Sequence, residues 1–307
     1  MSTPKQTLSG LLKISRPVAT ALAAGQPVVA LESTIITHGM PWPQNLETAH
    51  AVEQTVMDAG AVPATIAVLD GAIRIGLSAE ELDRLAHLKQ VRKLSRADLA
   101  HALVLGEAGS TTVAATMICA QLAGIQVFAT GGLGGVHRGA TESMDISADL
   151  GEFQKSEIVV VCAGAKAILD IPKTLEVLET LGIPVLSYGT DRFPAFWSRD
   201  SGLASPLRLD HPQQIADFMR IRKQLGQSGG VIVANPVPEA AEIDKQILEP
   251  LISRALKEAR AAGIGGKAVT PFLLQRIFEL TEGRSLETNI ALVLNNAVLA
   301  ARIAAEL

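Results

Sequence analysis

Aromatic side chains are scarce in this sequence, where phenylalanine, tyrosine and tryptophan together make up 3% of 307 residues. Hydrophobic residues nevertheless make up 48% of the chain, so its core must consist of alanine, valine, isoleucine and leucine. Such an aliphatic composition is typical of helices packed on a parallel sheet, whose buried strands are valine and isoleucine runs. The length suits one large α/β domain or two smaller ones.

Cysteine is also rare. Cys119 and Cys162 are the only two, and each lies within an apolar run. Neither has the spacing of a disulfide framework or of a zinc site. We therefore expect two free thiols that pack as small hydrophobic groups, and a reducing, cytoplasmic location.

Two further absences narrow the classes of function. The formal net charge is −4, whereas a protein that coats nucleic acid normally carries a basic excess or stripe. The N-terminal segment lacks the apolar core of a signal peptide, and no run approaches the roughly 20 apolar residues that span a bilayer. We expect neither a nucleic-acid nor a membrane partner; a small nucleotide is compatible with this charge.

Short β-type runs alternate with segments of helical spacing. We predict six strands, at residues 27–33, 64–69, 126–130, 157–163, 184–188 and 230–234. We predict helices at residues 46–59, 111–122, 174–181, 212–225, 238–261 and 289–306. This alternation indicates βαβ units, and we predict a single domain over residues 1–307, a three-layer α/β/α structure with a mainly parallel sheet. Because ligands bind beyond the carboxyl ends of such strands, polar residues there are candidate site residues.

Glu32 ends the first apolar strand and opens a loop that contains Thr34, His38 and a Pro-Trp-Pro run. An unpaired carboxylate is costly to bury, and a carboxyl group in a partly apolar cleft can act as general acid and base. A solvated glutamate at a strand end explains the same residue equally well.

A loop with five glycines follows residues 126–130 and contains His137 and Arg138 just before its last glycine. Glycines let backbone N–H groups approach an anion, and a neighbouring cation balances the charge of that anion. The loop is therefore a candidate phosphate site. It is neither a Walker A motif nor a GxGxxG leading into a helix, so neither a nucleoside triphosphate nor NAD is specifically indicated. A flexible connection accounts for the same residues.

Asp145 and Asp149 come next, with Ser147 between them. On one helix the two carboxylates share a face, and they repel unless a cation or a hydroxyl-rich ligand lies between them. Hard oxygen ligands suit Mg²⁺ or Mn²⁺. A solvated acidic turn is the alternative.

Lys166 follows the very apolar strand at residues 157–163 through a turn of small residues. Burial favours a neutral amine, and a neutral amine attacks carbonyl carbons to form Schiff bases. The alternative is a lysine whose stem is buried and whose ammonium reaches the surface. Lys93 is a second cation, in a loop.

Long motifs in the chain resemble the pseudouridine-5′-phosphate glycosidase family, which includes indigoidine-cluster proteins of the same type. The resemblance runs from Val28 to the C-terminal helix, and its motifs include VVALESTIITHGMPWPQN, KLSR, TTVAATM, FATGGLGGVHRG, DISADL, VVVCAGAKAILD, PAFW, VANPVPE, TPFLL and SLETNIALVLNNA.

The resemblance also implies roles for individual residues. It makes Lys166 the catalytic lysine, Glu32 the proton donor and Asp145 the ligand of a metal, typically Mn²⁺. It places substrate contacts at Lys93, Val113, Ser147, Ala148 and Asp149, with His137 and Asn289 as further site residues. It further implies a homotrimer of α/β/α subunits.

The implied reaction is the reversible cleavage of the C–C glycosidic bond of pseudouridine 5′-phosphate into uracil and ribose 5-phosphate. Lys166 would form a ring-opened Schiff-base adduct with the sugar. Two other functions fit the same residues: a Schiff-base aldolase or lyase acting on another sugar phosphate, and a non-catalytic sugar-phosphate sensor.

Overall fold

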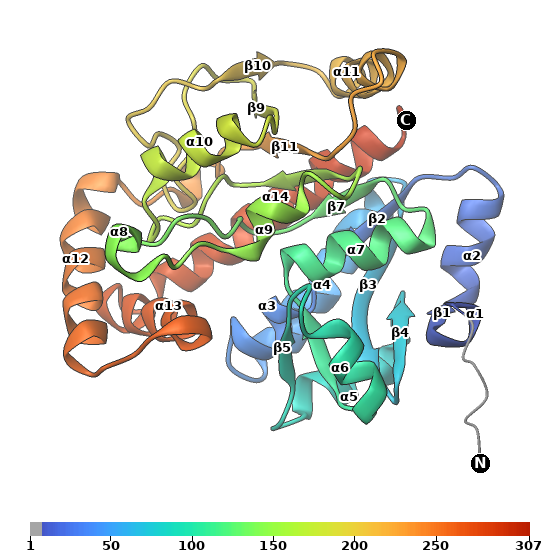
Figure 1. The fold of residues 1–307 in the computed structure, drawn as a ribbon, viewed down its shortest axis with the longest axis horizontal. Coiled ribbons are helices and arrows are strands. Elements are labelled where there is room, and N and C mark those ends of the chain that lie inside the picture. Colours follow the sequence, from blue (N-terminus) through green and yellow to red (C-terminus); the bar gives the residue numbers. More distant parts are fainter. Residues whose placement is uncertain (1–7) are drawn as a thin grey trace.

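A computed structural model describes residues 8–307 of the chain (Figure 1). Its centre is a run of parallel strands in the order β3-β2-β7-β8-β11-β9-β10. These strands are β2 (Val28–Leu31), β3 (Val62–Leu69), β7 (Val127–Ala129), β8 (Val159–Cys162), β9 (Val185–Tyr188), β10 (Leu207–Leu209) and β11 (Val231–Ala234). The six predicted strands are all confirmed, and β10 adds a short seventh.

The sheet also contains short strands that the sequence analysis did not predict. Two of them extend one edge, where β4 (Ala72–Ile75) pairs antiparallel with β3 and β1 (Leu12–Ile14) pairs with β4. The other two form a separate pair, β5 (Arg92–Leu94) and β6 (Gly109–Thr111). None of these four strands is a continuous apolar run, the pattern from which the central strands were predicted.

The length of β3 determines where the β5–β6 pair lies. Residues 62–65 of β3 pair with the four residues of β2, whereas Ala67 and Val68 pair with β6. The hydroxyl of Ser33, just after β2, accepts from the backbone N–H of Thr111 in β6 (2.9 Å). β6 therefore lies beside β3 beyond the carboxyl end of β2. It brings its partner β5 to the same edge of the sheet.

Helices cover both faces of the sheet, as predicted. Figure 1 shows α7 (Val113–Ala123) and α9 (Ala148–Glu152) in front of the sheet and α14 (Arg284–Ala304) crossing behind it. On the rear face, α14 packs on β2, β7 and β8 and also contacts α4 (Gln44–Asp58) and α11 (Pro212–Gln224). The three-layer α/β/α prediction is confirmed.

The predicted helix at residues 238–261 begins later than expected. Residues Glu239–Ala241 form a 3₁₀ turn, and α12 spans Lys245–Ala261 after Asp244, whose carboxylate accepts from the N–H of Gln246 (2.6 Å). The predicted C-terminal helix instead begins earlier, at Arg284. α10 (Ile171–Thr180) also starts a few residues before its predicted position. Residues 226–230 connect α11 to β11.

Several helices were not predicted: α1 (Leu8–Leu11), α2 (Arg16–Ala23), α3 (Thr34–His38), α5 (Ala79–His87), α6 (Leu99–Leu105), α8 (Ala140–Ser143) and α13 (Val269–Leu280). None of the helices within residues 8–307 is long and apolar enough to cross a membrane.

The core is aliphatic, as the composition requires. All four residues of β2, of β8 and of β11 are buried. The few aromatic residues are concentrated in this core, where Phe128, Phe153, Phe193 and Trp197 are each at most 1% exposed.

Both cysteines are free and fully buried, as predicted. Burial raises the pKa of each thiol to about 12, so the thiolate that reacts with alkylating reagents is nearly absent at neutral pH.

We expect iodoacetamide at pH 8 to leave Cys119 and Cys162 unmodified in the native protein and to label both in guanidinium, as measured by intact-mass spectrometry. Native labelling at the rate of a free thiol would contradict this burial.

Candidate active site

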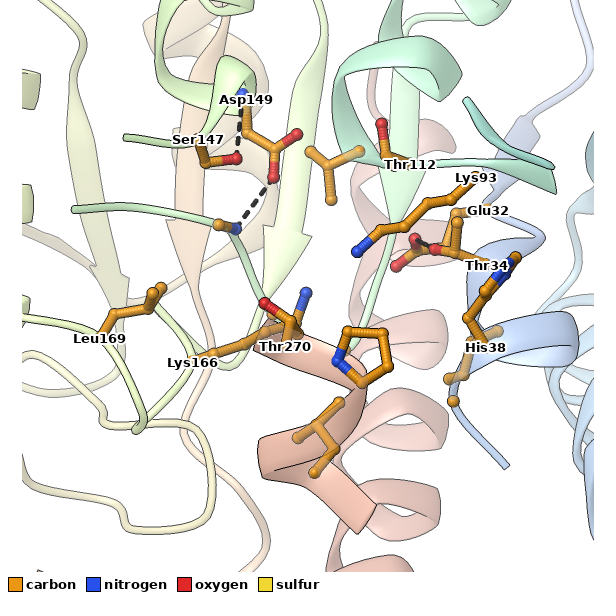
Figure 2. A pocket seen from close by; sticks show the side chains of 18 of the residues that line it. Glu32, Thr34, His38, Lys93, Thr112, Ser147, Asp149, Lys166, Leu169 and Thr270 are labelled. Atoms are coloured by element: carbon orange, nitrogen blue, oxygen red, sulfur yellow. Dashed lines mark hydrogen bonds between the residues drawn. The ribbon is translucent and has the colours of Figure 1, made fainter. Parts of the chain in front are cut away.

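A cavity of about 350 Å³ lies at the carboxyl ends of β2, β7 and β8 (Figure 2). Glu32 follows β2, the glycine loop follows β7, and Lys166 follows the turn after β8. The cavity brings together every residue to which the family resemblance gave a role: Glu32, Lys93, Val113, His137, Asp145, Ser147, Ala148, Asp149, Lys166 and Asn289. Residues from many separate segments therefore face one space.

Glu32 is half-buried and is held by two hydroxyl groups. The side chain of Thr34 donates to one carboxylate oxygen, and the side chain of Thr130, at the end of β7, donates to the other. A merely solvated glutamate would not need such partners. The pairing of β2 with β7 places the two threonines on either side of the carboxylate.

A buried amide network fixes the position of Thr130. Asn296 of α14 is fully buried, and its Nδ2 donates to the backbone oxygen of Thr130 (2.8 Å). Its Oδ1 accepts from Nδ2 of Asn235 (3.0 Å), whose backbone N–H donates to Cys162 O (2.8 Å). Thr130, Asn235 and Asn296 were not identified from the sequence, although asparagines in an apolar strand end and an apolar helix could have indicated them.

The turn that carries Lys166 is closely packed. Gly164 has φ +82°, and a Cβ there would lie 2.3 Å from the backbone oxygen of Pro194. The N–H of Lys166 donates to Leu133 O (3.1 Å), which joins this turn to the glycine loop. The side chain is half-buried, lines the cavity and extends toward it in Figure 2. Lys166 thus lines the cavity, whereas the alternative interpretation placed its ammonium at the outer surface.

Lys93 lies in β5 and brings a second positive charge to the same space. Its charge, together with burial, affects two imidazoles that line the cavity. Burial lowers the pKa of His38, and Lys93 lowers it further. Burial also lowers the pKa of His137, Asp145 opposes this shift, and Lys166 and Lys93 add to it. These shifts favour the neutral form of both imidazoles.

The expected pairing of Asp145 and Asp149 on one helix face is wrong. Asp149 lies in the first turn of α9, whereas Asp145 precedes that helix. The Asp149 carboxylate is buried and accepts from the backbone N–H groups of Ala114 and Gly134, both at 2.9 Å. It thus ties the start of α7 to the glycine loop, and its oxygens are already occupied by these donors.

The glycine loop is closely packed, in contrast to the flexible connection that was one of the two expectations. A Cβ at Gly132, Gly134 or Gly135 would lie 2.2–2.6 Å from the side chains of Phe196, Ser147 or Thr174. Close packing therefore requires these three glycines. The guanidinium of Arg138 points away from the cavity and binds the Glu249 carboxylate of α12 (2.5 and 3.0 Å). Arg138 also donates to the backbone oxygens of Ala167 and Leu169, so it joins α12 to the Lys166 loop.

Asp145 is the cavity residue best placed to hold a cation. Its side chain is 34% exposed, and Oδ2 lies 3.9 Å from Nδ1 of His137. The described part of the chain has no cluster of three or more His, Cys, Asp or Glu side chains that could surround a metal. One carboxylate supplemented by water and substrate oxygens is a donor set that Mg²⁺ or Mn²⁺ accepts.

The wall of the cavity formed by α13 and by the segment between β9 and β10 was not predicted from the sequence. Thr270, Pro271 and Leu274 of α13 line the cavity together with Phe196. Their motifs, TPFLL and PAFW, were among those that carried the resemblance, which was the available signal. A wall made mostly of apolar residues carries no chemical signature of its own.

Comparison with known proteins supports one family. The family model described as "Indigoidine synthase A like protein" matches residues 17–306. A protein of Paracoccus denitrificans named pseudouridine-5′-phosphate glycosidase is 67% identical over 297 residues, covering 96% of this chain and 98% of that protein. One of the same name from Methylobacterium nodulans is 65% identical, with 97% and 88% covered.

Two solved structures have the same fold. The prealnumycin C-glycosynthase AlnA, in complex with ribulose 5-phosphate, superposes with a TM-score of 0.89 at 40% identity, with 96% of each chain covered. An indigoidine synthase A-like protein of Thermotoga maritima gives a TM-score of 0.88 at 34% identity, again with 96% of each chain covered. With the matched family model and these long alignments, the chain belongs to the indigoidine synthase A-like family.

Proposed function

We propose that this chain is a pseudouridine-5′-phosphate glycosidase that reversibly cleaves pseudouridine 5′-phosphate into uracil and ribose 5-phosphate. The observation that carries the proposal is the presence of Lys166 and Glu32 in one cavity, with Lys93 as a second cation. The relatives at 65–67% identity bear this name.

The bond to be broken explains why a lysine is needed. Pseudouridine joins carbon 1′ of ribose to carbon 5 of uracil, and a carbon atom is a poor leaving group in ordinary glycoside hydrolysis. An imine at carbon 1′ provides an electron sink. A neutral lysine amine can form that imine with the opened sugar.

Cleavage then proceeds through formation of an adduct, breakage of the C–C bond and hydrolysis of the imine. Lys166 bonds to carbon 1′ as the ring oxygen leaves with a proton, and the resulting ring-opened adduct carries uracil and the lysine nitrogen on carbon 1′. Glu32 supplies a proton to uracil carbon 5, and the nitrogen lone pair expels uracil as the C–C bond breaks. Water then hydrolyses the imine, which releases ribose 5-phosphate and regenerates the amine. Glu32 is suited to these proton transfers because Thr34 and Thr130 orient its carboxylate.

The substrate phosphate fits the end of the cavity that carries positive charge. There Lys93 lies near the start of α7, where Val113 is the first helical residue. The first N–H groups of a helix lack intrahelical acceptors and favour an anion. Ser147, Ala148 and Asp149 line the same end, with Asp149 holding the start of α7 in place. Binding the phosphate here would position the opened sugar at Lys166.

A Mn²⁺ ion fits at Asp145, with His137 beside it. Such an ion would supply positive charge that organises the anionic groups of the substrate. In this arrangement Asp145 holds the metal, and the remaining coordination sites are left to water and substrate.

The lysine chemistry can be tested directly. We expect borohydride reduction in the presence of ribose 5-phosphate to attach the sugar phosphate to Lys166, and peptide mass spectrometry to locate it there. Lys166→Ala should abolish both the adduct and turnover. Absence of an adduct in the wild-type protein would support the sensor function instead.

Incubation with uracil and ribose 5-phosphate separates the remaining alternatives. Formation of pseudouridine 5′-phosphate supports the proposed reaction. An adduct at Lys166 without that product, even with Mn²⁺ present, would point to a Schiff-base aldolase or lyase.

Glu32→Gln should lower kcat by about 10²–10⁴-fold, the usual contribution of general acid–base catalysis. The amide retains the shape of the side chain but cannot transfer a proton. Glu53→Gln is a matched control, because Glu53 is a half-buried glutamate bonded to Thr65 outside the cavity. Equal losses in both variants would show that the effect is not specific to Glu32.

The resemblance to the family also supports a homotrimer in the cytoplasm. Sedimentation equilibrium should give three times the 32.2-kDa mass of the chain. A monomer at micromolar concentration would contradict the proposed trimer.

A further inference from the structure

Trp197 is a buried side chain whose polar atom reaches the edge of the cavity. The residue is 1% exposed, and its indole Nε1 donates to Oδ1 of Asn289 in α14 (2.6 Å). Its backbone is fixed as well, since Trp197 O accepts from the N–H of Ile243 (2.9 Å) and Ser198 Oγ donates to Ile243 O (2.6 Å). The indole therefore has one position.

This hydrogen bond determines which way the Asn289 amide faces. An indole N–H can only donate, so the amide atom turned toward it must be the oxygen. The NH₂ group of Asn289 then takes the other side of the amide. Asn289 lines the cavity, and its Nδ2 forms no hydrogen bond to any residue of the 8–307 range. It is a donor available to a ligand.

The two ends of the cavity indicate which part of the substrate lies against the NH₂ group of Asn289. Figure 2 shows Thr112, Ser147 and Asp149 at one end and Thr270 of α13 at the other, with the amines of Lys93 and Lys166 between them. The phosphate fits beside Lys93 and the start of α7. Pro271 and Leu274 line a smaller pocket together with Asn289, and Leu292 lies one turn after Asn289 in α14; these apolar side chains suit a flat, uncharged ring.

We propose that Trp197 sets the nucleobase preference of this cavity by holding the Asn289 amide with its NH₂ group toward the base. A donor at this position selects a base that presents a carbonyl oxygen there, as uracil does at carbon 4. Cytosine places an amino group on that carbon, so two donors would face each other and neither would be satisfied. The inference rests on the proposed function.

The test compares the binding of uracil and cytosine by calorimetry in the Lys166→Ala background with saturating ribose 5-phosphate. This background prevents the covalent reaction, so only equilibrium binding is measured. We expect uracil to bind at least tenfold more tightly than cytosine. Trp197→Phe frees the amide to rotate, and the ratio of the two Kd values should fall about fivefold, while the Kd of ribose 5-phosphate stays the same.

Two further variants show whether Trp197 acts through Asn289. In Asn289→Asp the indole still has an acceptor, but the second oxygen faces the base, so the preference should move toward cytosine. In Asn289→Ala, adding Trp197→Phe should change the ratio no further, since coupled residues are not additive. Trp42→Phe, at the exposed second tryptophan, is the matched control and should leave the ratio unchanged.

The proposal is overturned if Asn289→Asp retains the preference for uracil. It is also overturned if Trp197→Phe weakens ribose 5-phosphate binding as much as uracil binding, because that would be a general loss of structure. Failure of the wild-type protein to form pseudouridine 5′-phosphate would instead contradict the proposed function, since the binding ratio does not depend on turnover.

Discussion

The site depends on the pairing of β7 with β2 on one side and β8 on the other. Because the three strands are parallel, their carboxyl ends meet at one edge, and the residues that follow them face a common space. Glu32, the glycine loop and Lys166 are brought together by this pairing although they are far apart in the sequence. Asn296 of α14 reinforces it from the rear face by binding Thr130, whose hydroxyl holds Glu32.

Much of the central sheet could be predicted from the sequence, because its strands are continuous apolar runs that end in small or polar residues. β5 and β6 could not be, since their sequences RKL and GST are not apolar runs and their position depends on the length of β3. The late start of α12 was missed for a similar reason: the helical pattern gave no sign that a 3₁₀ turn and a capping aspartate come first. A local sequence pattern indicates which secondary structure a segment can form, but it does not indicate which other segment it pairs with.

The candidate site illustrates the same limit. Lys166 and Glu32 stand out because charged groups follow buried strands, whereas Asn296 and Trp197 act from inside the core through single hydrogen bonds. Arg138 was misassigned because a cation beside glycines suggests an anion site, yet its guanidinium is occupied by Glu249 and two carbonyl oxygens. Asp149 accepts hydrogen bonds from the backbone N–H groups of Ala114 and Gly134, and no sequence motif specifies such partners. Only the packed structure decides which partner a polar group takes.

The positive charge that Lys93 brings to the cavity depends on the register in which β5 pairs with β6. Lys93 lies opposite Ser110, and successive side chains of a strand point to opposite sides. A slip of one residue would turn Lys93 outward and present its exposed neighbour Arg92 or the buried Leu94 in its place. Insertions or deletions in the loops that flank this short pair could therefore alter ligand recognition without any change to a residue that touches the ligand.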